Sequence, residues 1–315
     1  MVSIIAVAGG TGDLGRTIVE AILADGKFSV IILSRKADDD KEKEIGARIL
    51  PVDYSSVDDI LRVLEENNVH TIISALNISF SVEPELNLIA AADQANSTKR
   101  YVPSIWGAEF TSEQVHTSSD YCILFMKTNT YSPVSRDAEE MPIVKPKILV
   151  ADALKKTNLE FTTWHPGYFA DYYVCPPLKS HLKSIVMAVD VVNNKAAIPG
   201  SGNVPVAFTF TRDLAKFVAA SLTLPMWETE TYLVGDKLTW NQLVDLAEAA
   251  KGVKFDVTYD SVERRAGTNL FAKFGLMFER GVFDFKVDVS IAQEFPDIKL
   301  RSMKELLEEA YKLEA

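Results

Sequence analysis

The segment from residue 4 to residue 15 constrains the fold of this chain more than any other part of the sequence. An apolar run, Ile4 to Ala8, is followed by Gly-Gly-Thr-Gly-Asp-Leu-Gly at 9–15, and apolar residues then recur at helical spacing. A strand, a glycine turn and the start of a helix together form the context of a dinucleotide-binding fingerprint. We therefore predict the first strand and helix of a parallel α/β sheet here, with a dinucleotide bound at the turn.

Three glycines, each three residues from the next, give this turn its chemistry. We expect Gly9 to adopt a backbone conformation that a side chain forbids, Gly12 to let the chain approach a pyrophosphate, and Gly15 to let the helix pack closely. The phosphates would lie at the helix N-terminus, where unpaired N–H groups and the helix dipole favour negative charge. The other turn residues that we assign to nucleotide binding are Thr11, Asp13 and Leu14.

A second apolar run, residues 28–33, ends in Ser34, Arg35 and Lys36. In doubly wound folds the residue at this strand end, about 20 residues past the glycines, meets the adenosine ribose. An acidic residue there would accept hydrogen bonds from a free 2′-hydroxyl, whereas the Arg35 guanidinium suits a 2′-phosphate and Lys36 adds a second positive charge. The sequence therefore favours NADPH over NADH. A solvated basic pair at a strand end is the alternative interpretation.

Strand and helix patterns continue to alternate as far as residue 165. Further strands are predicted at 48–52, 71–76, 100–103 and 160–164, with helices at 57–67, 84–95 and 148–157. Strands separated by helices imply right-handed crossovers and a doubly wound, parallel α/β (Rossmann) sheet, whose ligands lie at the carboxyl ends of the strands. The strand-end residues that this rule places near the nucleotide are Asp53, at the adenine edge, and Ala75, Leu76, Asn77, Pro103, Ser104 and Trp106.

Beyond residue 165 the alternation loosens. Helices are predicted at 212–222, 240–251 and 303–313, and a short strand at 255–259. We interpret residues 1–165 as an NADP-binding Rossmann domain and residues 166–315 as a smaller, C-terminal substrate-binding lobe. The boundary between them is soft, because segments of the second part can return to the main sheet.

The composition excludes several other classes of protein. The formal net charge of −11 argues against a nucleic-acid partner, since binding to a phosphate backbone needs a basic face. No apolar stretch approaches membrane-spanning length, and no secretory signal pattern precedes the first strand. Cys122 and Cys175 lack metal-ligand spacing. We expect a cytoplasmic protein without a metal, whose partner is a small molecule, and the oligomeric state stays open.

Several motifs along the chain carry a family resemblance. They are GGTGDLG at 9–15, LSR at 33–35, KRYVPSIWG at 99–107, FTTWHPGYFADYY at 161–173 and IPGSGNVPVAFTFTRDLAKFVAASL at 198–222. In these segments the chain resembles the isoflavone-reductase-like, NmrA-like branch of the atypical short-chain dehydrogenases, especially its fungal members. The resemblance implies a Rossmann fold. The branch contains reductases, redox-neutral enzymes and a cofactor-binding regulator of transcription.

The tyrosine that serves as proton donor in ordinary short-chain dehydrogenases is missing, since no tyrosine here has a lysine four residues later. In the resembling reductases a lysine at the start of the helix before the sixth strand takes part instead, and this position falls on Lys147, with Lys145 a weaker candidate. A lysine near the nicotinamide, its pKa lowered by burial, could donate a proton or polarise a carbonyl; a solvated lysine is the alternative. His165 and Tyr168, at the end of the predicted sixth strand and just beyond it, are further candidates, each with a structural role as its alternative.

Two segments are expected to shape a substrate pocket. The connection at 106–146 is far longer than usual, and long loops in compact domains are often binding loops. The segment 264–285 is rich in phenylalanine, which favours an apolar, aromatic or polycyclic substrate if these rings face the cleft rather than the core. We expect an NADPH-dependent reductase that transfers hydride to a carbonyl or an activated C=C or C=N bond. The alternatives are an NADP-sensing regulatory binding protein and a redox-neutral enzyme of secondary metabolism that keeps NADP as a structural cofactor.

Overall fold

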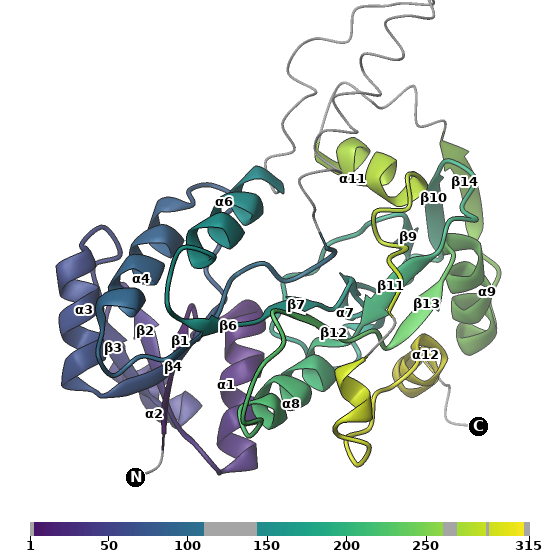
Figure 1. Ribbon diagram of the computed structural model, residues 1–315. Helices are drawn as coiled ribbons and strands as arrows, with labels where there is room; N and C mark the ends of the chain where they lie inside the picture. Colours follow the sequence, from purple (N-terminus) through teal and green to yellow (C-terminus); the bar gives the residue numbers. More distant parts are fainter. Residues whose placement is uncertain (1–2, 110–143, 261–269, 288–289, 312–315) are drawn as a thin grey trace, which may run out of the picture.

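A six-stranded parallel sheet organises the N-terminal half of the molecule (Figure 1). The computed structural model describes residues 3–109, 144–260, 270–287 and 290–311. The strands of this sheet are β1 (Ile4–Ala8), β2 (Ser29–Ser34), β3 (Arg48–Pro51), β4 (Val69–Ser74), β5 (Arg100–Val102) and β6 (Glu160–Phe161). Their order is β3-β2-β1-β4-β5-β6, and all neighbours are parallel. The predicted doubly wound Rossmann sheet is confirmed.

Helices cover both faces of this sheet (Figure 1). On one face α1 (Asp13–Asp25) packs against α8 (Thr211–Ser221); on the other lie α3 (Val57–Glu66), α4 (Glu83–Gln94) and α6 (Val144–Leu154). Strand β1 shows why its sequence is apolar throughout: Ile5 and Val7 belong to the cluster under α1, whereas Ala6 and Ala8 belong to the cluster under α3 and α4. Alternate side chains of a strand point to opposite faces, so a strand covered on both sides needs no polar residue.

The C-terminal half builds smaller sheets around a third apolar cluster. Strand β7 (Thr163–His165) pairs with β12 (Glu230–Tyr232). A three-stranded sheet consists of β8 (Tyr168–Phe169), β11 (Val206–Thr209) and β13 (Asp236–Leu238). Another consists of β9 (Val189–Asp190), β10 (Lys195–Pro199) and β14 (Asp256–Asp260). The helices are α7 (Asp171–Val174), α9 (Trp240–Lys251), α11 (Leu270–Glu279), the 3₁₀-helix η2 (Ile291–Gln293) and α12 (Met303–Tyr311). Since α8 packs on the main sheet, the division at residue 165 stays a prediction.

The predicted strand at 160–164 is wrong in one respect, because it is divided into two. Residue Thr162 still donates its N–H to Tyr101 of β5, but Thr163 donates to Thr229 and begins β7. The residue after β5 is Pro103, which has no N–H to continue the ladder. His165 therefore ends β7, in the pair with β12, and not the sixth strand of the main sheet.

Two helices also differ from the sequence-based expectation. The short helix α2 (Asp39–Ile45) was not predicted, because its residues are almost all charged and show no apolar period; the Asp38 carboxylate caps it. Helix α6 begins at Val144 rather than 148, which places Lys147 in its first turn.

Most of the long segment 106–146 and part of 264–285 lie outside the described residues. Within the described ranges, no helix is long and apolar enough to cross a membrane.

Candidate nucleotide and active site

The glycine turn after β1 has the geometry of a phosphate-binding turn. Gly9 has φ +77°, and a Cβ there would lie 2.8 Å from the Ala75 carbonyl oxygen. A Cβ on Gly15 would lie 2.3 Å from the Gly9 carbonyl oxygen, so both positions require glycine. Gly12 differs, since a Cβ there would have no atom within 4 Å. The space beside Gly12 is open at the point where a ligand would approach.

This open space lies at the N-terminus of α1, which has no side-chain cap. Helices α3 and α9, in contrast, are capped by the hydroxyls of Ser56 and Thr239. An uncapped helix N-terminus leaves N–H groups free for an anionic ligand. Of the other predicted turn residues, Thr11 is partly buried, Asp13 is exposed with φ 48°, and Leu14 is buried, so only the backbone of Leu14 is available to a ligand.

A cavity of ≈ 650 Å³ opens at the carboxyl ends of β2 and β3. Arg35, Asp53 and Tyr54 all line it, which places the predicted ribose and adenine contacts together. The Asp53 carboxylate accepts hydrogen bonds from the N–H and hydroxyl of Ser55, and these bonds lower the pKa of Asp53. Lys36 is exposed outside this cavity. Arg62 also lines the cavity but pairs with Asp59 and Glu66, so Arg35 is the guanidinium at the position where a 2′-phosphate is expected.

The predicted residues after β4 and β5 form a connected rim. The Ala75 N–H donates to Ala8 at 2.9 Å, and Asn77 accepts from the Ser79 N–H at 3.0 Å. Pro103 and Ser104 are buried, and the Ser104 hydroxyl donates to the Leu76 carbonyl at 2.7 Å. The Ser104 hydroxyl is thus used to join the two strand-end segments.

Lys147 lies at the end of this rim. Its Nζ donates to the carbonyl oxygen of Trp106 at 2.8 Å, and a Cβ on Gly107 would be 3.1 Å from the same Nζ. Burial lowers the pKa of Lys147 to about 8, because the ammonium loses water when it is enclosed by protein. A lysine whose pKa is lowered toward neutral pH suits proton transfer, so Lys147 stays the candidate proton donor.

His165 is held by protein groups on β12. Its Nε2 lies 2.6 Å from a carboxylate oxygen of Glu230, and its ring stacks on Tyr232 at 4.9 Å between centroids. Tyr232 in turn donates its hydroxyl to Glu109 at 2.9 Å. The His165 side chain is only 3% exposed, so the geometry favours the structural role over the catalytic one.

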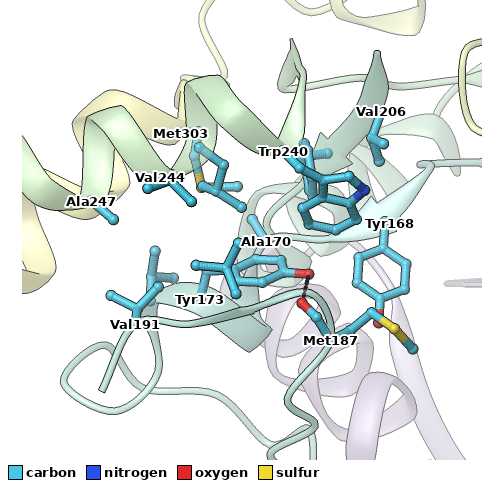
Figure 2. Packing of buried hydrophobic residues seen from close by; sticks show 14 of the residues in the cluster. Tyr168, Ala170, Tyr173, Met187, Val191, Val206, Trp240, Val244, Ala247 and Met303 are labelled. Atoms are coloured by element: carbon cyan, nitrogen blue, oxygen red, sulfur yellow. Dashed lines mark hydrogen bonds between the residues drawn. The ribbon is translucent and has the colours of Figure 1, made fainter. Parts of the chain in front are cut away.

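Tyr168 lies in the aromatic cluster of the C-terminal half (Figure 2). Its ring contacts Phe278 at 5.3 Å and Phe283 at 5.8 Å, both edge to face. Burial raises the pKa of the Tyr168 phenol far above neutral. The structure thus places Tyr168 among aromatic residues of the core. The interactions described here include none between Tyr168 and Lys147.

Sequence reasoning missed one buried acid, Glu85. It lies on α4 and is fully buried, and its carboxylate accepts hydrogen bonds from three groups near the ends of β4 and β5. A signal was present, because Glu85 shares the helix face of Leu88, Ile89 and Ala92, which point to the core.

The fold and the turn define a dinucleotide-binding Rossmann protein. The chain belongs to the NmrA-like family, the group that also contains the isoflavone-reductase-like proteins; the model of the NmrA-like family matches residues 1–119. Within the described part of the chain, no cluster of His, Cys, Asp and Glu side chains is arranged to hold a metal ion.

Relatives and solved structures match nearly the whole chain. Oxidoreductase BOA1 of Botryotinia fuckeliana is 32% identical over 307 residues, which cover 93% of this chain and 95% of the relative. Pinoresinol reductase 2 of Arabidopsis thaliana is 26% identical, and the match covers 96% of this chain and 95% of the relative. The binary complex of leucoanthocyanidin reductase with NADPH from Vitis vinifera has a TM-score of 0.75 at 19% identity, with 98% of this chain and 99% of that chain covered. Both relatives are thus named as an oxidoreductase or a reductase, and the fold shared with the solved structure covers nearly the whole chain.

Proposed function

We propose that this chain is an NADPH-dependent reductase of a small hydrophobic metabolite. The observation that carries the proposal is the position of Lys147. Its ammonium lies beside the segment after β5, at the end of the series of strand-end segments that begins with the glycine turn, and its pKa is lowered to about 8. Support comes from relatives that are oxidoreductases or reductases and from a structural neighbour that contains NADPH.

The residues present fit NADPH at each part of the site. The glycine turn and the N-terminus of α1 would hold the pyrophosphate, and Arg35 would bind the 2′-phosphate, with Asp53 beside the adenine. The rim of Ala75, Leu76, Asn77, Pro103 and Ser104 would border the nicotinamide half. When bound, NADPH supplies a hydride.

The chain's own contribution to the chemistry would be made by Lys147. Its ammonium would donate a proton to the substrate atom, or polarise a carbonyl oxygen, next to the nicotinamide. The Trp106 carbonyl orients this ammonium. The described rings of the segment 264–285 do not support a substrate class, since Phe278 and Phe283 are buried in the core. The substrate class we propose is aromatic or polycyclic, with a carbonyl or an activated C=C or C=N bond as the acceptor, and its support is the similarity to pinoresinol reductase 2.

Arg35→Glu tests the choice of cofactor. The change replaces a cation that pairs with the 2′-phosphate by an anion that repels it, and loss of a charged hydrogen-bonding partner costs roughly 1.5–3 kcal/mol. We expect NADPH affinity to fall by about 10- to 100-fold and NADH affinity to change little. Fluorescence titration of both nucleotides measures this.

The matched control is Lys43→Glu, which makes the same change of charge on α2 at a side chain that is 79% exposed. This variant should leave the affinity ratio of the two nucleotides unchanged. Equal weakening of NADPH and NADH by Arg35→Glu would refute the 2′-phosphate contact. A chain that binds NADPH but oxidises it with no aromatic carbonyl or alkene would support the regulatory or redox-neutral alternatives.

A further inference from the structure

Glu85 is a buried acid that nothing in the proposed chemistry uses. Its side chain has no exposed surface, and its carboxylate accepts hydrogen bonds from the Ser74 hydroxyl at 2.5 Å, the Ser104 N–H at 3.0 Å and the Tyr101 hydroxyl at 3.1 Å. These donors come from the end of β4, from β5 and from the segment after β5. One carboxylate on α4 thus joins two neighbouring strand ends.

The same network reaches the candidate site. The carbonyl of Ser74 accepts a hydrogen bond from the Trp106 indole at 2.8 Å, and the Ser104 hydroxyl donates to Leu76 at 2.7 Å. Trp106 is also the residue whose carbonyl receives the Lys147 ammonium. Displacement of Ser74 or Ser104 would therefore move the backbone of both segments and the residue that orients Lys147.

These segments belong to one half of the nucleotide site. The adenosine end lies at β2 and β3, where Arg35 lines the cavity, and the pyrophosphate turn follows β1. The order of strands then leaves the ends of β4 and β5 for the nicotinamide half. We propose that Glu85 is a positioning residue for the nicotinamide half of the nucleotide, because its carboxylate fixes the two backbone segments, after β4 and after β5, that border that half. The inference rests on the proposed function.

A stabilising role alone does not account for Glu85. Burial raises its pKa to about 6, against the opposing effect of its three hydrogen bonds. The folded state therefore holds the proton more tightly than the unfolded state does, and the stability of the fold decreases as pH rises from about 4.5 through 6. An ionised Glu85 at neutral pH thus destabilises the fold. What the ionised carboxylate provides is a defined geometry, because it holds three hydrogen-bond donors in fixed positions.

Glu85→Gln tests the proposal, because the amide keeps the shape of the side chain but removes the negative charge that accepts all three hydrogen bonds. One carboxylate oxygen becomes an NH2 group, which cannot accept, so the partner that donated to it must turn round or lose its hydrogen bond. The probes are NADPH and adenosine 2′,5′-bisphosphate, which lacks the nicotinamide half. We expect the variant to bind NADPH roughly tenfold more weakly, since a hydrogen bond to a charged group is lost, and to bind the bisphosphate within about twofold of the unmodified protein.

Tyr101→Phe is the matched control. It removes one donor to the same carboxylate but leaves the two donors that belong to the strand ends, so the ratio of the two affinities should stay within about twofold of that of the unmodified protein. Hydrogen exchange of the amides at 74–77 and 104–107, measured without nucleotide, should be faster in Glu85→Gln and unchanged in Tyr101→Phe. Thermal unfolding of each variant shows whether it is folded.

The pH dependence adds a measurement that a purely structural role would not change. The ratio of NADPH to bisphosphate affinity in the unmodified protein, divided by the same ratio in Glu85→Gln at each pH, should fall as pH decreases below about 6, where Glu85 gains its proton. The 2′-phosphate titrates near pH 6 in both probes, and the bisphosphate also has a 5′-phosphomonoester that titrates there, whereas the 5′-phosphate of NADPH is part of a pyrophosphate. These titrations are the same for both proteins, so the comparison with Glu85→Gln at each pH removes them. The phenols that face Glu85, Tyr101 and Tyr54, have pKa values raised far above this range.

Equal weakening of both probes by Glu85→Gln, an unchanged ratio, or a ratio with the same pH dependence in the variant and in the unmodified protein would each overturn the role of Glu85. Tight binding of the bisphosphate and NADPH by the unmodified protein keeps the proposed function intact in all three cases. Failure of the unmodified protein to bind either probe would instead refute the proposed function, and the role of Glu85 with it.

Discussion

Lys147→Met is expected to lower the rate of NADPH oxidation by roughly 10²–10⁴-fold, the usual effect of losing a positioned acid. Methionine keeps the apolar part of the side chain and removes the ammonium, so the fold and the affinity for NADPH should stay nearly unchanged. Single-turnover oxidation of NADPH by an aromatic carbonyl compound, together with a nucleotide titration of the same variant, separates catalysis from binding.

The pH profile of the unmodified protein gives the same test a second measurement. Because the pKa of Lys147 is lowered to about 8, the ammonium that donates the proton is lost as pH rises through that value, and the rate should decline there. In Lys147→Met this decline should be absent from the residual rate.

Lys145→Met distinguishes the two lysines of the first turn of α6. Lys145 is exposed, whereas Lys147 is partly buried with its ammonium on the Trp106 carbonyl, so we expect only Lys147→Met to slow turnover. A near-normal rate in Lys147→Met would exclude this lysine as the proton source. Loss of NADPH affinity in that variant would make Lys147 a contact to the nucleotide instead.

Arg301→Met is expected to lower the free energy of unfolding by about 3–5 kcal/mol, since it leaves a buried carboxylate without its main partner. Arg301 donates to both carboxylate oxygens of Asp213 at 2.9 Å, and the Asp213 side chain has no exposed surface. The guanidinium also lies over the Phe210 ring at 4.7 Å from its centroid. The ion pair between Arg301 and Asp213 thus links the C-terminal segment to α8. Urea denaturation of the variant measures the change.

A second arginine provides the comparison. Arg62 also pairs with two carboxylates, those of Asp59 and Glu66, but its side chain is 54% exposed. Since water screens exposed ion pairs, Arg62→Met should leave the free energy of unfolding nearly unchanged. Equal destabilisation by the two substitutions would show that the burial of Asp213 is not what gives Arg301 its effect.

The nucleotide-binding half of the protein was predictable because its determinants are local. An apolar strand buried on both faces, a turn that only glycine can form and an amphipathic helix follow one another within 25 residues, and each can be recognised from neighbouring residues alone. The position of Arg35 follows for the same reason, since the length of one strand–helix–strand unit sets where the second strand ends.

The candidate catalytic residues were less predictable because their roles depend on distant contacts. Sequence spacing indicated Lys147, but only the folded chain shows that its ammonium meets the Trp106 carbonyl, 41 residues away. The sequence alone left a catalytic and a structural role open for His165 and Tyr168. Their neighbours in the fold, Glu230 for the first and the aromatic cluster for the second, come from far along the chain.

By itself the sequence determined the parallel sheet and the glycine turn, and it predicted the preference for a 2′-phosphate, since these depend on residue type and short-range spacing. Only the tertiary structure decided that the sixth strand divides after Phe161 and that α8 returns to cover α1. It also decided that Glu85 joins the ends of β4 and β5. Each of these features depends on which segments meet, and that is set by the burial of apolar surface and the pairing of buried polar groups across the whole chain.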